Sequence, residues 1–282
     1  MKIIDTHFHL WDASVLTLPT LQLFKGQLKE KYTLEDYSRA IKGFPILESV
    51  YMEVDAIKEE HQKEAEMAID LCKDPSNIVV GATIAGDLAT ETFKEYIALF
   101  AKESAVKSVR HNMFAADPAV TKSQIFIENV NLLAELGLMC DLVMPVEKIL
   151  SGVHLVKACP KTTFVVDHCG LCPVGASKTV QEPWKKAISA YAKNPNVICK
   201  VSECGFTNPH HQWSCREVEG IIFHCIESFG PERIVYGTNW PICTITGTVG
   251  GWIEALESVL RRFPVEYSEN LFFQNAKRLY FL

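Results

Sequence analysis

The sequence lacks several features that would place it in other classes of protein. No Gly-x-Gly-x-x-Gly follows the first apolar run, so a dinucleotide-binding sheet has no support. No apolar run reaches the roughly 18 residues that indicate a membrane span, and no basic segment precedes an apolar one as in a signal peptide. Basic residues are not in excess, because 28 Lys and Arg stand against 34 Asp and Glu. We therefore expect a small-molecule substrate and no nucleic-acid or membrane partner.

Cysteine is present, but the two cysteine pairs that a zinc finger requires are missing. Ten cysteines are scattered through a chain of 282 residues, which is too long for a disulfide-stapled secreted scaffold. We interpret them as reduced thiols in a cytoplasmic protein. Cys169 and Cys172 have the spacing of a redox or zinc pair, yet no second pair accompanies them, so a structural loop is the preferred interpretation.

Strand and helix patterns alternate along the whole chain. The β-rich runs are residues 2–7, 46–54, 78–84, 106–110, 138–143, 163–167, 197–202 and 234–238. Helical patterns follow them, with a start at Thr33 and then residues 56–72, 91–103, 123–135, 146–158, 182–193, 216–229 and 249–262. This alternation predicts a parallel sheet with right-handed crossovers, and eight repeats favour one (β/α)8 TIM barrel over residues 1–282. An open doubly wound sheet is the alternative.

Polar side chains recur where the predicted strands end, which is where barrel enzymes build their sites. These residues are His7, His9, Glu53, Arg110, His111, Asp141, His168, Lys200, Ser202, Asn239 and Trp240. The irregular stretch 11–31 follows the first strand, so we expect it on the same face as a lid or pocket wall. His210 and His211 lie in a predicted loop at 206–214, as a pocket wall or a solvated turn.

Two histidines open the chain at a spacing that points both to one face. Side chains at i and i+2 of a strand project together, so Asp5, His7 and His9 are expected on one wall. Two imidazoles directed into a barrel need partners or a metal, and we interpret this pair as half of a metal site. His168 is a candidate third imidazole, or a satisfied buried histidine.

The other charged candidates have two interpretations each. Arg110 and His111 present donors to a substrate carboxylate or lactone oxygen, or Arg110 pairs with a carboxylate on the rim. Glu53 and Asp141 are general bases or ligands, or they hold Arg110 and Lys200 by ion pairs.

Several motifs in order resemble the amidohydrolase superfamily, in particular its branch of TIM-barrel lactonases. The segments that carry the resemblance are 5–11 (Asp-Thr-His-Phe-His-Leu-Trp), 108–111 (Ser-Val-Arg-His), 166–170 (Val-Asp-His-Cys-Gly), 195–202 (Pro-Asn-Val-Ile-Cys-Lys-Val-Ser), 236–241 (Tyr-Gly-Thr-Asn-Trp-Pro) and 275–280 (Asn-Ala-Lys-Arg-Leu-Tyr). One position departs from the pattern. Asn239 stands where the family has an Asp on its eighth strand, and an amide cannot take a proton near neutral pH.

The resemblance implies a set of roles. One divalent metal, zinc or manganese, would be held by His7, His9 and His168, although a metal-free site is also allowed. Catalytic roles fall to His168, Asn239, Glu53 and Asp141. The implied substrate contacts are Arg110, His111, Lys200, Ser202, Trp11 and Trp240.

Three functions follow as hypotheses. The first is a hydrolase that opens a small carboxylated or sugar-derived lactone. The second is a lyase that decarboxylates an unsaturated or aromatic acid, because the wider superfamily includes such enzymes. The third is a small-molecule binding barrel that has lost its base, which Asn239 favours. No long heptad seam marks an association face, so the sequence predicts no oligomeric state.

Overall fold

Eight parallel strands form the centre of the molecule, as the sequence predicts. The computed structural model describes residues 1–114, 116–208, 210 and 212–282. The sheet runs in the order β1 (Ile3–Phe8), β4 (Ile46–Met52), β5 (Val79–Ala85), β6 (Val106–Asn112), β7 (Met139–Val143), β8 (Phe164–Val166), β9 (Val197–Ser202) and β10 (Ile234–Gly237). Each strand pairs in parallel with the next. The strand order follows the chain order, as in a (β/α)8 barrel.

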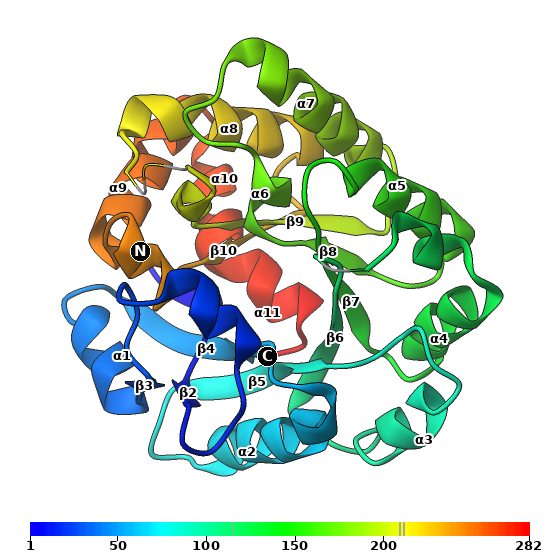
Figure 1. Ribbon diagram of the computed structural model, residues 1–282. Coiled ribbons are helices and arrows are strands. Elements are labelled where there is room, and N and C mark those ends of the chain that lie inside the picture. The colour runs from blue at the N-terminus through cyan, green and yellow to red at the C-terminus, as the bar shows by residue number, and fades with distance from the viewer. Residues whose placement is uncertain (115, 209, 211) are drawn as a thin grey trace.

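The barrel closes where β10 meets β1. Asn239 donates its backbone N–H to the carbonyl of His7 at 2.8 Å, and His9 donates to that of Trp240 at 2.7 Å. Seen end-on, helices surround the strands on all sides (Figure 1). This closure decides against the open sheet, which was the alternative from the sequence.

The strands are covered by the helices that the amphipathic patterns predict and by three short helices, at residues 168–171, 265–269 and 275–279, that the patterns do not predict. They are α1 (Leu34–Ala40), α2 (His61–Lys73), α3 (Phe93–Ala98), α4 (Gln124–Glu135), α5 (Ile149–Ala158), α6 (His168–Leu171), α7 (Lys178–Ala192), α8 (Cys215–Phe229), α9 (Val249–Leu260), α10 (Val265–Glu269) and α11 (Asn275–Leu279). Thr33 caps α1, and its hydroxyl and the carboxylate of Asp36 satisfy each other's backbone N–H groups. The first predicted turn of α2 is instead loop and the 3-10 turn η2 (Lys58–Glu60). No helix of the described residues is long and apolar enough to cross a membrane.

The stretch after β1 covers the carboxyl ends of neighbouring strands. It contains β2 (Trp11–Asp12), the 3-10 helix η1 (Pro19–Phe24) and β3 (Lys31–Tyr32), and β2 pairs antiparallel with β3. Its position matches the predicted lid or wall. Shorter 3-10 turns lie at η3 (Pro118–Lys122), η4 (Gly205–Thr207) and η5 (Ile242–Ile245).

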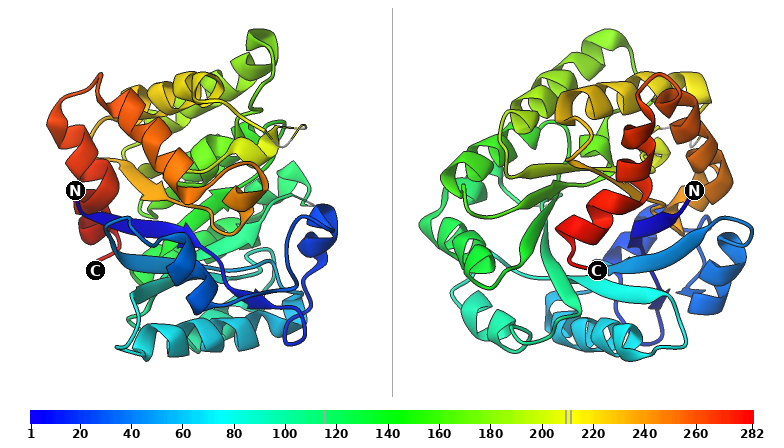
Figure 2. Two further views of the ribbon diagram at one scale, coloured as in Figure 1. Left: turned by 90° about the vertical axis from the view of Figure 1, so that its left-hand side faces the viewer. Right: turned by 180° about the vertical axis from the view of Figure 1, so that it is seen from behind.

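The C-terminal segment covers the opposite end of the barrel. A π-helical turn, η6 (Asn270–Gln274), leads into α11, which crosses the barrel when it is viewed from behind (Figure 2). Tyr280 is fully buried and packs with Val50, Met139, Val165, Ile198 and Val235, an inner core separate from the main core under the helices. The site therefore has a closed floor, and its open side is at the carboxyl ends of the strands.

Candidate active site

β1 brings His7 and His9 together, as their spacing predicts. Their Nε2 atoms lie 3.2 Å apart, and both side chains are buried. Nδ1 of His9 lies 3.0 Å from the carbonyl oxygen of Met52 and 2.9 Å from that of Glu53. Because carbonyls only accept hydrogen bonds, Nδ1 is the protonated nitrogen of His9, and its Nε2 directs a lone pair toward His7.

Asp5 does not join the two imidazoles, although alternation along a strand predicts that it would. The register of β1 against β4 is irregular between Asp5 and Phe8. The Asp5 carboxylate accepts hydrogen bonds from Tyr37 Oη at 2.7 Å and from Thr238 Oγ1 at 2.6 Å. It also accepts from the backbone N–H of His7 at 3.1 Å, so it fixes the main chain that carries the first histidine.

The end of β8 supplies two further groups. His168, in a left-handed backbone conformation with φ of 50°, places its Nδ1 2.9 Å from Ser202 Oγ. Its ring centroid lies 4.4 Å from that of His7. Ligand atoms of His7, Asp167 and His168 all lie within 4.8 Å of one another. The predicted meeting of His7 and His168 is present, but Asp167 completes this group of three, and His9 contacts it only through His7.

The chemistry of His7, Asp167 and His168 fits a divalent metal ion. His7 Nδ1 and Asp167 Oδ1 are 3.5 Å apart. Among the described residues, His7 Nδ1 has no hydrogen-bond partner, and Asp167 Oδ1 has only the ion pair with Lys200 Nζ at 3.1 Å. Burial lowers the pKa of His7 well below its usual value and that of His168 to about 3, so both imidazoles are neutral. Burial disfavours the Asp167 carboxylate, but the Lys200 ammonium together with the neighbouring His7 and His168 outweighs it and holds its pKa well below the usual range. Neutral imidazoles with an ionised carboxylate are a common zinc ligand set.

Lys200 lies beneath this group and has no exposed surface. Its Nζ is 2.6 Å from Asp141 Oδ2 and 3.1 Å from Asp167 Oδ1, and Asp141 also accepts from Ser108 Oγ. Burial disfavours the ammonium, but the two carboxylates together keep the Lys200 pKa above its usual value. The structure thus gives Lys200 carboxylate partners, where the resemblance implied a substrate contact.

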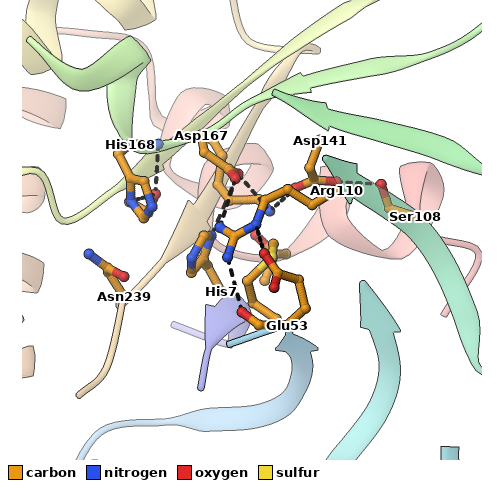
Figure 3. Close-up of polar contacts among 12 residues, drawn as sticks. His7, Glu53, Ser108, Arg110, Asp141, Asp167, His168 and Asn239 are labelled. Atoms are coloured by element: carbon orange, nitrogen blue, oxygen red, sulfur yellow. Dashed lines mark hydrogen bonds and ion pairs between the residues drawn. The ribbon is translucent and has the colours of Figure 1, made fainter. Parts of the chain in front are cut away.

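Arg110 links Asp167 to the end of β4 (Figure 3). Its Nε donates to Glu53 Oε1, one terminal nitrogen donates to the Glu53 carbonyl at 3.0 Å, and the other lies 3.4 Å from Asp167 Oδ2. Of the two interpretations of Glu53 and Asp141, the structure therefore shows the ion pairs with Arg110 and Lys200. Arg110 has five N–H groups, and two have no partner among the described residues.

Asn239 lies beside His7 and His168, on the side away from Arg110 (Figure 3). Its φ of 56° is in the left-handed region, which Asn adopts more readily than most residues. Its amide nitrogen donates to the carbonyl of Glu203 at 3.3 Å. The amide oxygen is thereby left to accept a hydrogen bond or to approach a metal.

The remaining predicted contacts lie around this centre. Trp11 and Trp240 are buried in one aromatic wall, with ring centroids 5.0 and 5.2 Å from that of Tyr32. His111 is partly buried beside the end of β5, where its Nδ1 lies 3.2 Å from the Gly86 carbonyl. Their contacts with substrate stay predictions.

The cysteine pair and the histidine loop are away from these contacts. Cys169 and Cys172 are buried free thiols, and Trp184 Nε1 donates to the Cys169 carbonyl at 2.7 Å. His210 is exposed, and its backbone N–H forms a turn with Asn208 Oδ1 at 2.9 Å. His211 lies outside the described residues.

Sequence reasoning did not select Asp167 or Glu203, although each adjoins a selected residue. Glu203 directly follows Ser202 and is fully buried, with Oε1 accepting from the Gly205 N–H at 2.6 Å and from Thr246 Oγ1 at 2.9 Å. Its Oε2 has no partner among the described residues, and burial raises its pKa to about 7. The available signal was position, since Asp167 ends a predicted strand and Glu203 directly follows one.

Known proteins resemble this chain along its whole length. It is 24% identical to the Sinorhizobium fredii protein y4mH, with 99% of this chain and 98% of that one covered. It is 23% identical to an L-fucono-1,5-lactonase of Burkholderia multivorans, with 92% and 91% covered.

Solved structures share the fold. An amidohydrolase from Burkholderia multivorans, crystallised with bound zinc, superposes with a TM-score of 0.90 at 20% identity, with both chains fully covered. A 2,6-dihydroxybenzoate decarboxylase from Rhizobium superposes with a TM-score of 0.66 at 11% identity, covering 99% of this chain and 98% of that one.

A family model, described as amidohydrolase, matches residues 4–282. Its span includes every strand-end residue discussed above. The chain belongs to the amidohydrolase family, and the hydrolase predicted from its motifs is confirmed at that level.

Proposed function

We propose that this protein is a metal-assisted lactonase that opens a small, sugar-derived lactone by hydrolysis. The observation that carries the proposal is the convergence of two neutral imidazoles, His7 and His168, with the ionised Asp167 beside Arg110. A lactonase needs a polarised carbonyl, a water molecule and donors that hold the ring. The name of the Burkholderia multivorans relative supports the sugar-derived class.

His7, Asp167 and His168 would hold the metal, with His9 Nε2 adjacent to His7. A divalent ion bound there would supply Lewis-acid polarisation and a water molecule of lowered pKa. The low pKa of His168, about 3, suits a ligand better than a general base. Ser202 fixes the orientation of the His168 ring through Nδ1.

The other residues orient the reactants. Lys200 keeps Asp167 ionised and immobile. Arg110 offers its two unpaired N–H groups to the lactone oxygens, while Glu53 fixes the plane of the guanidinium. Asn239 cannot accept a proton, so its role is to orient water through its amide oxygen. A metal-activated water makes a strand-eight carboxylate less necessary.

A lactone panel tests this proposal. The purified protein is stripped of metal, reloaded with zinc or manganese, and assayed with sugar 1,5-lactones by a pH indicator. We expect turnover that depends on the metal and on His7. Absence of turnover on every lactone with either metal would contradict the proposal.

The Asn239→Asp variant separates a working site from an eroded one. We expect kcat to fall, because a carboxylate would face the Glu203 carbonyl that the amide now donates to. A large rise in kcat would instead show that a lost base limits the enzyme, and would favour the impaired barrel. Release of carbon dioxide from an unsaturated or aromatic acid would favour the decarboxylase.

A further inference from the structure

A cavity of about 210 Å³ opens beside Arg110, at the carboxyl ends of β4, β5 and β6. Its polar lining includes Glu53, Asp55, Lys58, Asp87, Arg110 and Asn112. Glu53 and Arg110 belong to the site already described, so the cavity adjoins the reacting centre. It lies where the part of a substrate remote from the carbonyl would extend.

The cations of this cavity are already paired. Arg110 pairs with Glu53, and Lys58 Nζ lies 2.6 Å from Asp87 Oδ2. With Asp55 added, three carboxylates face two cations, and the rest of the polar lining is Asn112 and the imidazoles of His61 and His111. The fixed charge is therefore negative, which disfavours a carboxylated ligand.

Asp55 has two properties that mark it among these groups. Its φ is 58°, a left-handed conformation that costs energy for a residue other than glycine. Its carboxylate accepts from Asn112 Nδ2 at 2.6 Å and from Thr20 Oγ1 in η1. Asp55 thus joins the segment after β1 to the end of β6 across the cavity wall.

That segment is held over the same side of the barrel by other contacts. The Ile57 N–H donates to the Thr17 carbonyl at 3.0 Å, and Lys63 Nζ donates to the Val15 carbonyl at 2.7 Å. These contacts hold the segment after β1 against the segment after β4, which carries Asp55, so residues on both sides fix the position of its side chain. An ionised carboxylate has about four acceptor positions, and Asp55 uses two of them here, so it can accept from ligand hydroxyls.

We propose that this cavity binds the hydroxyl groups of an uncharged, polyhydroxylated substrate, with Asp55 as the residue that determines specificity. Asp55 and Asp87 accept hydrogen bonds from ring hydroxyls, while Arg110 holds the lactone oxygens. The cavity then selects a sugar lactone over a dicarboxylated one. This inference rests on the proposed lactonase function for its kinetic test.

The test compares two lactones with the same ring, a sugar 1,5-lactone and unsubstituted δ-valerolactone. Asp55→Asn is the main variant, because Asn tolerates the left-handed backbone and keeps the side-chain shape. We expect kcat/KM for the sugar lactone to fall at least 10-fold, mostly through KM, and that for δ-valerolactone to change less than 2-fold. Asp87→Asn should likewise lower kcat/KM for the sugar lactone more than for δ-valerolactone, because the proposal gives its carboxylate the same contact with ring hydroxyls.

Thr20→Val is the matched control, since it removes a partner of Asp55 and leaves the carboxylate. It should affect both lactones to a similar, small extent. Equal losses on both lactones for Asp55→Asn would overturn the proposal by making Asp55 purely structural. Tighter binding of a dicarboxylated pyrone than of the sugar lactone to the wild type would also overturn it.

Failure of the proposed function is distinguishable from failure of this inference. If the wild type turns over no lactone, binding of L-fucose, an uncharged pyranose, is measured by saturation-transfer NMR. Binding that Asp55→Asn reduces at least 10-fold supports the hydroxyl subsite without any turnover. No binding to the wild type would overturn it.

Discussion

The side chains at the ends of β1, β8, β9 and β10 are almost completely buried, whereas several in the segments after β4 and β5 and at the end of β6 line a cavity open to solvent. We call the first set, His7, His168, Lys200, Glu203 and Asn239, the imidazole side. The second set, Asp55, Lys58, His61, Asp87 and His111, is the cavity side. Arg110 contacts Asp167 on one side and Glu53 on the other.

We interpret this difference in burial as a division of roles, with the reaction on the imidazole side and substrate recognition on the cavity side. Burial on the imidazole side makes each charge costly unless it is paired, and it holds the imidazoles neutral. On the cavity side, water screens the charges, so they contribute little to folding and remain available to a ligand. The same substitution should therefore have different effects on the two sides.

The largest expected effect is on the reaction. His7→Asn should lower kcat/KM by a factor of about 10³ or more, because it removes a ligand of the reacting centre. His61→Asn, the same change on the cavity side, should lower it less than about 10-fold, since its position implies recognition only. Steady-state kinetics on the sugar lactone measures both. Comparable losses would contradict the division of the two sides.

The next effect is on stability. Lys200→Met leaves Asp141 and Asp167 as buried carboxylates without their cation, so the free energy of unfolding should fall by about 3–5 kcal/mol. Urea denaturation at pH 7 measures the change. Adding Asp141→Asn should recover part of the loss, because it removes one unpaired charge; no recovery would argue against the ion pair.

The third prediction concerns the pH dependence of stability. Glu203 has a folded-state pKa of about 7, raised by burial from the usual 4.5. Its protonated form therefore stabilises the fold fully below pH 4.5, and this contribution is lost as pH rises through 7. Glu203→Gln cannot ionise, so its stability relative to wild type, measured by urea denaturation, should be higher at pH 8 than at pH 5, by about 2.5 kcal/mol. An equal difference at both pH values would mean that Glu203 is not protonated in the fold.

The smallest effect is expected for the exposed ion pair. Lys58→Met repeats the Lys200 substitution on the cavity side, where the Lys58 side chain is 55% exposed. The free energy of unfolding should change by less than about 1 kcal/mol. The same urea denaturation measures it, and a loss as large as that of Lys200→Met would show that exposure does not explain the contrast.

The fold followed from sequence because each local pattern agrees with the final structure. Eight apolar runs became eight barrel strands, and the cap at Thr33 starts a helix where its pattern indicates. The C-terminal helices escaped prediction. α10 and α11 have five residues each, which is too short for a clear helical period.

The sequence predicted which residues form the candidate site better than it predicted which of them contact each other. His7, His168 and Arg110 meet because strand ends meet in a barrel, which sequence position alone indicates. Two local features were not visible in the sequence. The register of β1 is irregular between Asp5 and Phe8, and the backbone is left-handed at His168, next to Asp167. Neither leaves a periodic signal. The burial of Lys200 could not be predicted either. A lysine that points into the barrel occupies the same kind of strand position whether it contacts the substrate or lies below it.

The closed floor of the barrel has a consequence for the dielectric environment of the site. The Tyr280 ring centroid lies 6.0 Å from the Lys200 ammonium, and the ring is fully buried in the inner core. It therefore excludes water from the space below Lys200 and its two carboxylates, where their mutual attraction is stronger than it would be in water. The strength of these ion pairs thus depends on a side chain that the C-terminal segment supplies.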